Sequence, residues 1–549
     1  MNNTYQNKVI ELGFSSDIKY ADPFNDIELS VQFSGPDNEK MLVPAYWAGK
    51  EEWRVRYSSS KIGVHHFTTV CSDKSNKSLH GRKGKVEVSV YTGENKLMKH
   101  GAVGISENGR YFEHKDKTPF FWLGDTWWMA LTKRLDWPDD YMTLVKDRVR
   151  KGFSVIQIVA GLYPDMPWFD DRGRNEAGFP WDKDFDRIDP LYFDNADKKI
   201  DMLVENGLLP CIVGCWGYFL NWMGIEKMMK HWRYLAARYG AYPVIWCLAG
   251  EGSMPYHLSD QKDEDTESLR NGWTEIGRYL RTIDPYKRPV TIHPVNNSRD
   301  TITDDTILDF DMLQTGHSDR ESLSNTVETI KKSYNSIPVM PVIDGEVCYE
   351  GIGEACRQEV QRLMFWASIL NGAAGHTYGA NGVWQLNSRK QPYGKSPHGM
   401  SWGNTPWRDA YRLPGSSHLG MSKKLLEKYK WWETEPHPEW IEPRFSGSDY
   451  FLPYSAGIKG ELRIFYFPKV HWQRIVIKDI EPGIIYDAFL IDPTNCKRID
   501  LGRVNGDMNG DWIFQEKVSI TKKSEFPIYQ DWLLFMTRTT DKKRGSENG

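Results

Sequence analysis

The stretch Pro-Val-Ile-Trp-Cys-Leu-Ala-Gly-Glu-Gly-Ser at residues 243–253 is an apolar run that stops at Glu251, between Gly250 and Gly252. Residues 244–248 are β-forming and lack polar alternation, which is typical of a strand buried on both faces of a parallel sheet. We therefore expect Glu251 at the rim of such a sheet, where the glycines permit a sharp turn or the close approach of a ligand. Taken alone, the stretch fits an ordinary strand-end acid facing water equally well.

A second stretch has the same design. Residues 338–350 read Pro-Val-Met-Pro-Val-Ile-Asp-Gly-Glu-Val-Cys-Tyr-Glu, again an apolar strand followed by a glycine and a glutamate, Glu346. Glu350 and Glu354 are rivals for its role, but they fit a loop and a helix start, whereas Glu346 stands at the strand end. Two such strand ends in one chain predict a pair of carboxylates.

The region around these stretches alternates between strands and amphipathic helices. The predicted strands are 120–125, 153–160, 208–216, 243–250, 289–295, 311–317, 338–345 and 374–380. The predicted helices between them are 138–151, 196–206, 225–239, 267–283, 322–336 and 355–371. Eight strands with crossover helices predict a (β/α)8 TIM barrel over residues 106–436. A doubly wound open sheet is the alternative, weakened because no strand leads into a glycine-rich phosphate loop.

The two ends of the chain have a different pattern. Short alternating runs without convincing helices predict an N-terminal β-sandwich at residues 1–105. A second small antiparallel β-domain, also sandwich-like, is predicted at residues 437–549, and its last few residues are expected to be disordered. We expect the β-domains to brace the barrel and the interface of a homo-oligomer, without supplying catalytic groups.

Composition narrows the classes of partner. The chain has 549 residues, 40% hydrophobic and 26% charged, which predicts a soluble protein of two or three domains. Its net charge of −4 is spread along the chain, so neither nucleic acid nor a membrane surface is an expected partner. The 23 Trp and 27 Tyr residues include rings near strand ends, where flat aromatic faces stack well on sugars.

The start of the chain and the cysteines bear on the compartment. The N-terminus has no apolar core of a signal peptide, and no run of about 18 apolar residues follows. Seven cysteines form an odd set, several of them within apolar strands, which favours reduced, buried thiols. We therefore expect a cytoplasmic protein, with a removed secretion signal as the alternative.

Residues at the carboxyl ends of the predicted strands form the candidate site, because the active site of a TIM barrel lies at that rim. The predicted catalytic pair is Glu251 on strand four and Glu346 on strand seven. The predicted substrate-binding residues, taken from the other strand ends and following loops, are Asp125, Trp127, Gln157, Trp216, His293, Gln314, His317, Tyr378 and Trp384.

Each of these side chains also has an ordinary structural interpretation. Asp125 is as well suited to capping the next helix as to accepting a hydrogen bond from a sugar hydroxyl. His293 and His317 are compatible with structural histidines. Among the aromatic residues, Trp216 and Trp384 are favoured as sugar platforms over simple packing.

The stretch Phe-Phe-Trp-Leu-Gly-Asp-Thr-Trp-Trp at residues 120–128, preceded by Asn-Gly-Arg-Tyr-Phe at 108–112, resembles the start of the barrel in the apiosidase-like glycoside hydrolases, relatives of clan A. The resemblance implies a β-sandwich before the barrel and a β-domain after it. It also implies Glu251 as the acid/base and Glu346 as the nucleophile. One departure is Gly250, because clan A usually has Asn there to contact the sugar 2-hydroxyl. Members of the group vary between Asp and Glu at the strand-four position, so the substrate is not carried over.

Physical chemistry assigns the same roles. Cleaving a glycosidic bond needs one protonated and one ionised carboxyl group. Glu251 follows apolar and aromatic residues, which raise the pKa of a carboxyl group. Glu346 is expected opposite His293 or His317, which lower its pKa, while Asp344 acts in the other direction.

The sequence therefore predicts a retaining glycoside hydrolase that acts on a plant or microbial oligosaccharide. Long loops at residues 161–195 and 381–405 predict walls around a pocket and hence exo-action, with an open cleft as the alternative. No cofactor and no metal are expected, since no His-x-His follows strand one and no His-Glu-x-x-His helix occurs. The rival hypothesis is a non-catalytic carbohydrate-binding protein on the same scaffold.

Overall fold

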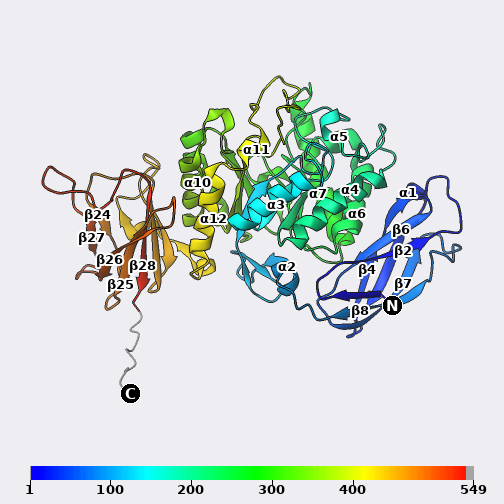
Figure 1. Ribbon diagram of the computed structural model, residues 1–549, viewed down its shortest axis with the longest axis horizontal. Helices are drawn as coiled ribbons and strands as arrows, with labels where there is room; N and C mark the ends of the chain where they lie inside the picture. The colour runs from blue at the N-terminus through cyan, green and yellow to red at the C-terminus, as the bar shows by residue number, and fades with distance from the viewer. Residues whose placement is uncertain (1, 540–549) are drawn as a thin grey trace, which may run out of the picture.

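The computed structural model describes residues 2–539, which form a central barrel between two β-domains (Figure 1). This arrangement confirms the predicted fold class of a TIM barrel flanked by an N-terminal β-sandwich and a C-terminal antiparallel β-domain. The disorder predicted for the end of the chain concerns residues outside the described range.

The barrel is a nearly closed parallel sheet of eight strands within residues 2–539, in the order β16-β15-β14-β13-β12-β19-β18-β17. Its strands are β12 (Trp122–Thr126), β13 (Val155–Val159), β14 (Leu209–Val213), β15 (Ile245–Cys247), β16 (Val290–Thr291), β17 (Asp311–Gly316), β18 (Val342–Val347) and β19 (Gly375–Tyr378). Most of these strands are buried along their whole length, which explains their continuous apolar runs.

Helices connect successive strands and surround the sheet. The long ones are α3 (Asp139–Lys151), α4 (Pro190–Glu205), α6 (Ile225–Tyr239), α7 (Lys262–Ile283), α9 (Ser322–Tyr334), α10 (Gln358–Leu370) and α12 (Pro414–Leu426). Shorter ones are α5 (Phe219–Met223), α8 (Ser298–Thr301) and α11 (Trp407–Ala410). Helix α3 has Asp139 and Asp140 in its first turn and basic residues in its last, as the helix dipole favours, and it ends at Gly152 with φ 93°.

The N-terminal domain is a sandwich of two sheets that share one apolar core. The larger sheet has the order β1-β8-β7-β3-β4, and the smaller has the order β2-β6-β5. The strands are β1 (Asn2–Tyr5), β2 (Ile10–Ser15), β3 (Leu29–Ser34), β4 (Lys40–Pro44), β5 (Tyr46–Gly49), β6 (Glu52–Tyr57), β7 (Gly63–Cys71) and β8 (Lys83–Ser89). The short helices α1 (Pro23–Asp26) and α2 (Lys96–Lys99) belong to this part, and a small sheet of β9 (Val103–Ile105), β10 (Phe112–His114) and β11 (Pro119–Phe120) leads into the barrel.

The C-terminal domain also consists of two sheets with a common core. One has the order β20-β22-β23-β28-β25-β26, and the other has the order β21-β24-β27. The strands are β20 (Glu435–Pro436), β21 (Ile441–Glu442), β22 (Tyr454–Ile458), β23 (Leu462–Phe467), β24 (Ile475–Ile477), β25 (Tyr486–Ile491), β26 (Arg498–Val504), β27 (Trp512–Gln515) and β28 (Trp532–Arg538). Arg362 of α10 donates to both carboxylate oxygens of Asp531, at 2.8 and 2.7 Å, which joins this domain to the barrel.

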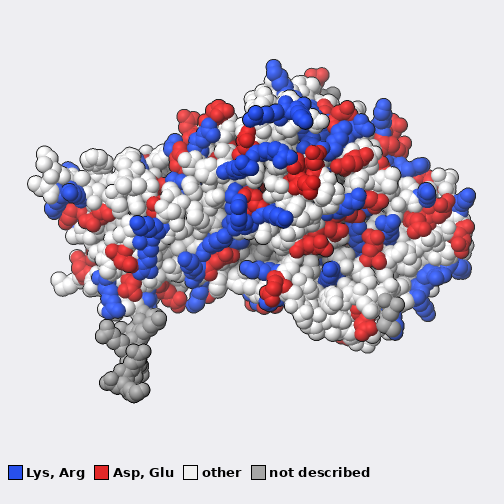
Figure 2. All heavy atoms as spheres, viewed as in Figure 1, with Lys and Arg blue, Asp and Glu red and all other residues white. Residues whose placement is uncertain are grey.

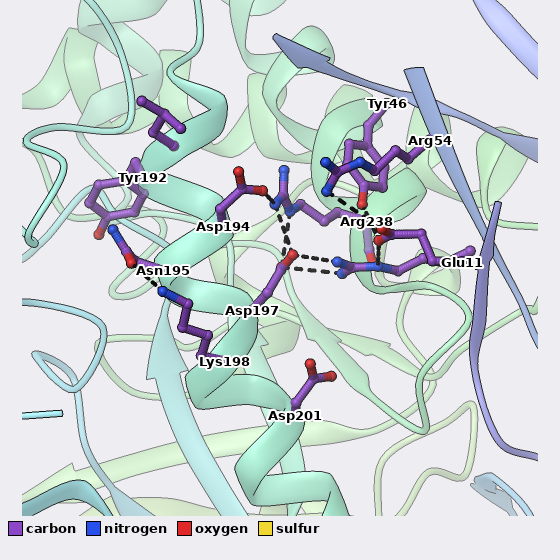
Figure 3. A network of polar contacts seen from close by, with 12 residues as sticks. Glu11, Tyr46, Arg54, Tyr192, Asp194, Asn195, Asp197, Lys198, Asp201 and Arg238 are labelled. Carbon is purple, nitrogen blue, oxygen red and sulfur yellow. Dashed lines mark hydrogen bonds and ion pairs between the residues drawn. The ribbon is translucent and has the colours of Figure 1, made fainter. Parts of the chain in front are cut away.

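A buried ion network (Figure 3) joins the N-terminal domain to the side of the barrel that lies opposite the C-terminal domain (Figure 1). Arg56 of β6 donates to Glu11 of its own domain at 2.9 Å and forms an ion pair with Asp197 of α4. Arg238 of α6 donates to the same Asp197 at 2.9 Å. Two guanidinium groups overcome the effect of burial and lower the pKa of Asp197 to about 2. The domain contact is therefore a fully ionised network.

The surface, the helices and the cysteines each add an observation. On the face in Figure 2, acidic and basic side chains are interspersed. None of the helices between residues 2 and 539 has the length and apolar character that crossing a lipid bilayer would need. All seven cysteines are unpaired, and all except the partly exposed Cys496 are buried, which agrees with the prediction of buried thiols.

Candidate active site

Glu346 lies on β18 between two histidines. Its side chain is almost fully buried, and His317 Nε2 lies 2.9 Å from its Oε1 in a hydrogen bond. His293 Nε2 lies 3.1 Å from its Oε2, but without the alignment of a hydrogen bond, so this contact is mainly an electrostatic attraction. Burial alone would raise the pKa of Glu346, yet the two histidines hold it well below its usual value of 4.5. Glu346 is therefore ionised at neutral pH.

Two further titratable groups near Glu346 support this charge state. Burial opposes protonation of His317, but the Glu346 carboxylate prevails and raises the pKa of this histidine. Burial raises the pKa of Asp344 to about 8. Asp344 is therefore mostly protonated at neutral pH and adds little of the negative charge beside Glu346 that its sequence position suggested.

Glu251 follows β15, at the same rim of the barrel. Gln314 Nε2 donates to its Oε1 at 3.1 Å, and Trp216 Nε1 donates to its Oε2 at 3.3 Å. Burial and the negative charge of Glu346 raise the pKa of Glu251 to about 7. A substantial fraction of Glu251 is therefore protonated at neutral pH.

The glycines beside Glu251 have a role different from the predicted sharp turn. The left-handed conformation falls on Glu251 itself, with φ 44°, and not on either glycine. A Cβ at Gly250 would lie 2.2 Å from the Trp216 ring, and one at Gly252 would lie 2.4 Å from Ile292 Cδ1. The glycines are thus required because side chains of the neighbouring strands pack directly on the backbone, which positions Glu251.

The two glutamates share one electrostatic environment. The charge of Glu346 raises the pKa of Glu251, and His293 acts on both carboxyl groups. The ring of Trp216, whose indole binds Glu251, lies 6.3 Å from the His293 ring. The site therefore combines an ionised and a protonatable carboxyl group, the charge states that glycosidic cleavage needs.

Aromatic rings surround this pair. Trp128 makes edge contacts with Trp216 and His293, with ring centroids 5.7 and 5.4 Å apart. Tyr349 lies 4.8 Å from the His317 ring and 6.3 Å from the Trp384 ring. Trp216 thus contacts Glu251 and Trp384 lies against Tyr349, with both rings nearly covered. Their role as sugar platforms stays a prediction.

Several buried polar atoms of this region have no hydrogen-bond partner within residues 2–539. They are Glu346 Oε2, Gln314 Oε1, His317 Nδ1, Tyr349 Oη and Trp384 Nε1. Buried polar atoms in folded proteins are nearly always paired, so a cluster of unpaired ones calls for an explanation. A ligand rich in hydroxyl groups has the donors and acceptors to satisfy them.

The structure places three of the predicted substrate-binding residues, Asp125, Trp127 and Tyr378, away from the glutamates. Asp125 is fully buried and accepts from Arg148 Nε of α3 at 2.6 Å and from Trp127 Nε1 at 2.5 Å. Tyr378, its neighbour on β19, donates to Glu350 at 2.6 Å. All these groups lie between the barrel wall and its helices, because side chains of a strand alternate between the two faces. Asp125 therefore neither caps α3 nor reaches a ligand.

The remaining predicted residue is inside the barrel. Gln157 is fully buried on β13, and its Nε2 donates to the backbone oxygen of Gly345 at 3.1 Å, directly before Glu346. Gln157 supports the β18 backbone from within. It therefore positions the nucleophile candidate and does not reach the rim.

Sequence reasoning missed Trp128 and Tyr349. Trp128 is one residue beyond the predicted Trp127, and this single step moves the ring from the outside of the barrel to the site. Tyr349 stands three residues after Glu346 and directly before Glu350. The only signal for either residue was its closeness to a strand end.

The acids that rivalled Glu346 have other roles. Glu350 is fully buried and accepts from Tyr378 and from the backbone N–H of Gly415 at 3.0 Å. Glu354 is exposed and pairs with Arg357 at 2.9 Å. Neither carboxylate contacts Glu251 or Glu346, so the strand-end choice of Glu346 agrees with the geometry.

Comparisons with known proteins give separate matches for the barrel and for the N-terminal domain. The family model of the apiosidase-like catalytic domain matches residues 106–433, and a domain of unknown function, DUF5060, matches residues 4–72. No curated protein matches the chain.

Solved structures resemble this chain at low sequence identity. A glycoside hydrolase shares 23% identity with a TM-score of 0.64, and the match covers 81% of this chain and 98% of the other. A family 5 glycoside hydrolase from Bacteroides vulgatus shares 24% identity with a TM-score of 0.65, covering 81% and 94%. A second Bacteroides vulgatus structure shares 18% identity with a TM-score of 0.71, covering 98% and 100%. At these identities the structures establish a common fold.

Proposed function

The chain belongs to the family of apiosidase-like catalytic domains, and from this premise we propose that it is a retaining, exo-acting glycoside hydrolase of plant or microbial oligosaccharides. The observation that carries the proposal is the opposite charge preference of two neighbouring carboxyl groups: Glu346 ionised, and Glu251 with a pKa of about 7. Two similar solved structures are themselves glycoside hydrolases.

In the proposed reaction, Glu346 attacks the anomeric carbon while Glu251 protonates the departing glycosidic oxygen. The C–O bond to the leaving group breaks, and a glycosyl ester with Glu346 forms. Ionised Glu251 then takes a proton from water, which attacks the same carbon and releases Glu346. His293 and His317 hold the nucleophile in place and stabilise its charge between turnovers.

The residue before the acid/base cannot supply a side-chain contact, since Gly250 stands there. Gln314 is suited to replace it, because its Nε2 donates to Glu251 and its Oε1 has no partner within the described residues. We propose that Gln314 Oε1 accepts a hydrogen bond from a sugar hydroxyl beside the scissile bond.

Exo-action is supported by the way the long rim loops hold one another. Tyr393, in the loop after β19, donates to the backbone oxygen of Pro164 in the loop after β13, at 3.0 Å. Arg172 donates to the backbone oxygen of Tyr393 at 3.1 Å, and Trp402 Nε1 donates to Asp165 at 2.8 Å. Loops joined in this way close one side of the rim, which favours binding of a chain end over binding along an open cleft.

The test is hydrolysis of a panel of aryl glycosides and plant oligosaccharides, with the products followed by NMR. We expect release of single terminal sugars with retained anomeric configuration from at least one substrate, and no release by the Glu346→Gln variant. Binding of oligosaccharides without turnover would instead support the rival carbohydrate-binding protein. An inverted product would replace the covalent step by direct attack of water.

A further inference from the structure

Three rim loops bring two histidines and an aspartate together. Asp165 comes from the loop after β13, His257 from the loop after β15, and His398 from the loop after β19. One ligand atom from each residue lies within 4.8 Å of the other two. His257 Nε2 is 3.3 Å from Asp165 Oδ1, and the two imidazole rings are 4.1 Å apart between centroids.

The neighbours of this cluster orient its ligand atoms. Trp402 Nε1 donates to Asp165 Oδ2 at 2.8 Å, which fixes the carboxylate and leaves Oδ1 directed to His257. Ser396 Oγ lies within 3.3 Å of both ring nitrogens of His398, so it can hold one nitrogen while the other binds a ligand. Such supporting contacts typically accompany the ligands of metal ions in proteins.

We propose that Asp165, His257 and His398 bind a divalent transition-metal ion of the Zn²⁺ class, which fastens the three loops at the mouth of the barrel. Two imidazole nitrogens and a carboxylate oxygen are a donor set that Zn²⁺ prefers, with water in the fourth position. Ligands of a tetrahedral ion lie about 3.3 Å apart when the bonds are about 2.0–2.1 Å long. Ligand atoms within 4.8 Å of one another reach that spacing by small side-chain rotations.

The proposed ion is structural and takes no part in bond cleavage. Its ligands are on the loops and neither glutamate is among them. Asp165 is nevertheless close enough to Glu251 for its negative charge to raise the pKa of that carboxyl group. A bound cation would offset this charge, so metal binding would affect the pKa of Glu251 only through electrostatics.

The test is calorimetric titration of the metal-stripped full chain with Zn²⁺, repeated with Co²⁺, whose visible absorption reports its ligands. We expect one ion per chain and a nitrogen-containing, four-coordinate Co²⁺ spectrum. The variants His257→Ala, His398→Ala and Asp165→Asn should each weaken binding by at least about ten-fold. Zn²⁺ should also raise the Tm of the unaltered chain, and a chelator should reverse the rise.

The matched control is His437→Ala. His437 pairs with Glu439 at 2.8 Å in the C-terminal domain, and its side chain is 21% exposed, compared with 20% for His257. This variant should bind the ion like the unaltered chain. Failure to bind Zn²⁺ at micromolar concentration, or equal binding by all variants, would overturn the proposal. Circular dichroism separates loss of the site from loss of the fold.

Discussion

Glu251 and Glu346 have identical side chains, yet their neighbours shift the pKa values of the two carboxyl groups in opposite directions. Glu346 lies against two imidazole rings that favour its charge, whereas Glu251 accepts hydrogen bonds from an amide and an indole and faces the charge of Glu346. Each of these causes is a contact that a substitution can remove. Predictions at the scale of single residues follow from those contacts.

The first prediction separates the two catalytic roles. An activated phenolate leaves without protonation, so Glu251→Ala should keep much of its first step on an activated aryl glycoside and regain turnover with azide. Glu346→Ala should lose activity on every substrate, with kcat/KM at least about 10³-fold lower. Steady-state kinetics on activated and natural substrates measure both effects. The opposite pattern would exchange the two roles.

The second prediction concerns pH. The reaction needs Glu251 protonated, so kcat/KM should fall about ten-fold per pH unit above its pKa of about 7. Glu346 must be ionised, and its lowered pKa places the acid limb well below pH 4.5. Gln314 stabilises ionised Glu251, so Gln314→Leu should move the alkaline limb to higher pH. A limb that moved to lower pH, in protein folded by circular dichroism, would contradict this electrostatic account.

At the scale of elements, β12 and α3 are held together by a buried ion pair. Arg148 Nε donates to Asp125 at 2.6 Å, both side chains are fully buried, and Arg148 also pairs with Asp147 at 2.6 Å. Such a pair costs desolvation energy and is maintained because removing one partner leaves an uncompensated charge. Asp125, which was predicted to bind sugar, therefore stabilises the contact between β12 and α3.

The third prediction follows from that pair. Arg148→Met should lower the free energy of unfolding by about 3–5 kcal/mol, because Asp125 stays buried without its cation. The control is Arg278→Ala on α7, which removes an exposed pair with Asp304 and should leave the free energy of unfolding nearly unchanged. Urea denaturation measures both. If the Arg148 variant kept its stability but lost substrate affinity, the result would contradict the structural role of Asp125 and support its predicted role in substrate binding.

At the scale of the whole molecule, the barrel is held from both sides. The network of Arg56, Asp197 and Arg238 joins it to the N-terminal domain (Figure 3). The pair of Arg362 with Asp531 joins it to the C-terminal domain, which lies at the other end of the molecule (Figure 1). Both contacts use buried arginines that bind carboxylates through two nitrogens, which fixes orientation as well as distance. The geometry supports the bracing role expected from the sequence.

The fourth prediction tests that bracing. Arg56→Met should lower the free energy of unfolding by about 3–5 kcal/mol, since Asp197 loses one of its two cations, and removal of residues 1–105 should leave an aggregating barrel. The control is Arg54→Ala on the same strand, whose partly exposed pair with Glu11 is worth at most about 1 kcal/mol. Light scattering and thermal unfolding measure the outcome. A soluble, fully active chain without residues 1–105 would contradict the bracing role.

The sequence by itself determined the barrel, its flanking β-domains and the positions of the two glutamates. These features depend on local patterns: continuous apolar runs for buried strands, a 3.6-residue period for helices, and a polar residue where an apolar strand stops. The rim of a parallel barrel collects strand ends whatever the details of packing. Glu251 and Glu346 were therefore identifiable from order along the chain.

Only the tertiary structure decided which neighbouring side chains join the glutamates. A shift of one residue along a strand moves a side chain to the other face, so Trp128 lies at the site while Trp127 and Asp125 lie behind it. The pKa of each glutamate depends on partners distant in sequence, His293 and His317 for Glu346 and Gln314 for Glu251. The cluster of Asp165, His257 and His398 has no spacing that a motif records, because three separate loops bring it together. Local patterns specify elements, but the contacts between elements are set by register and packing over the whole chain.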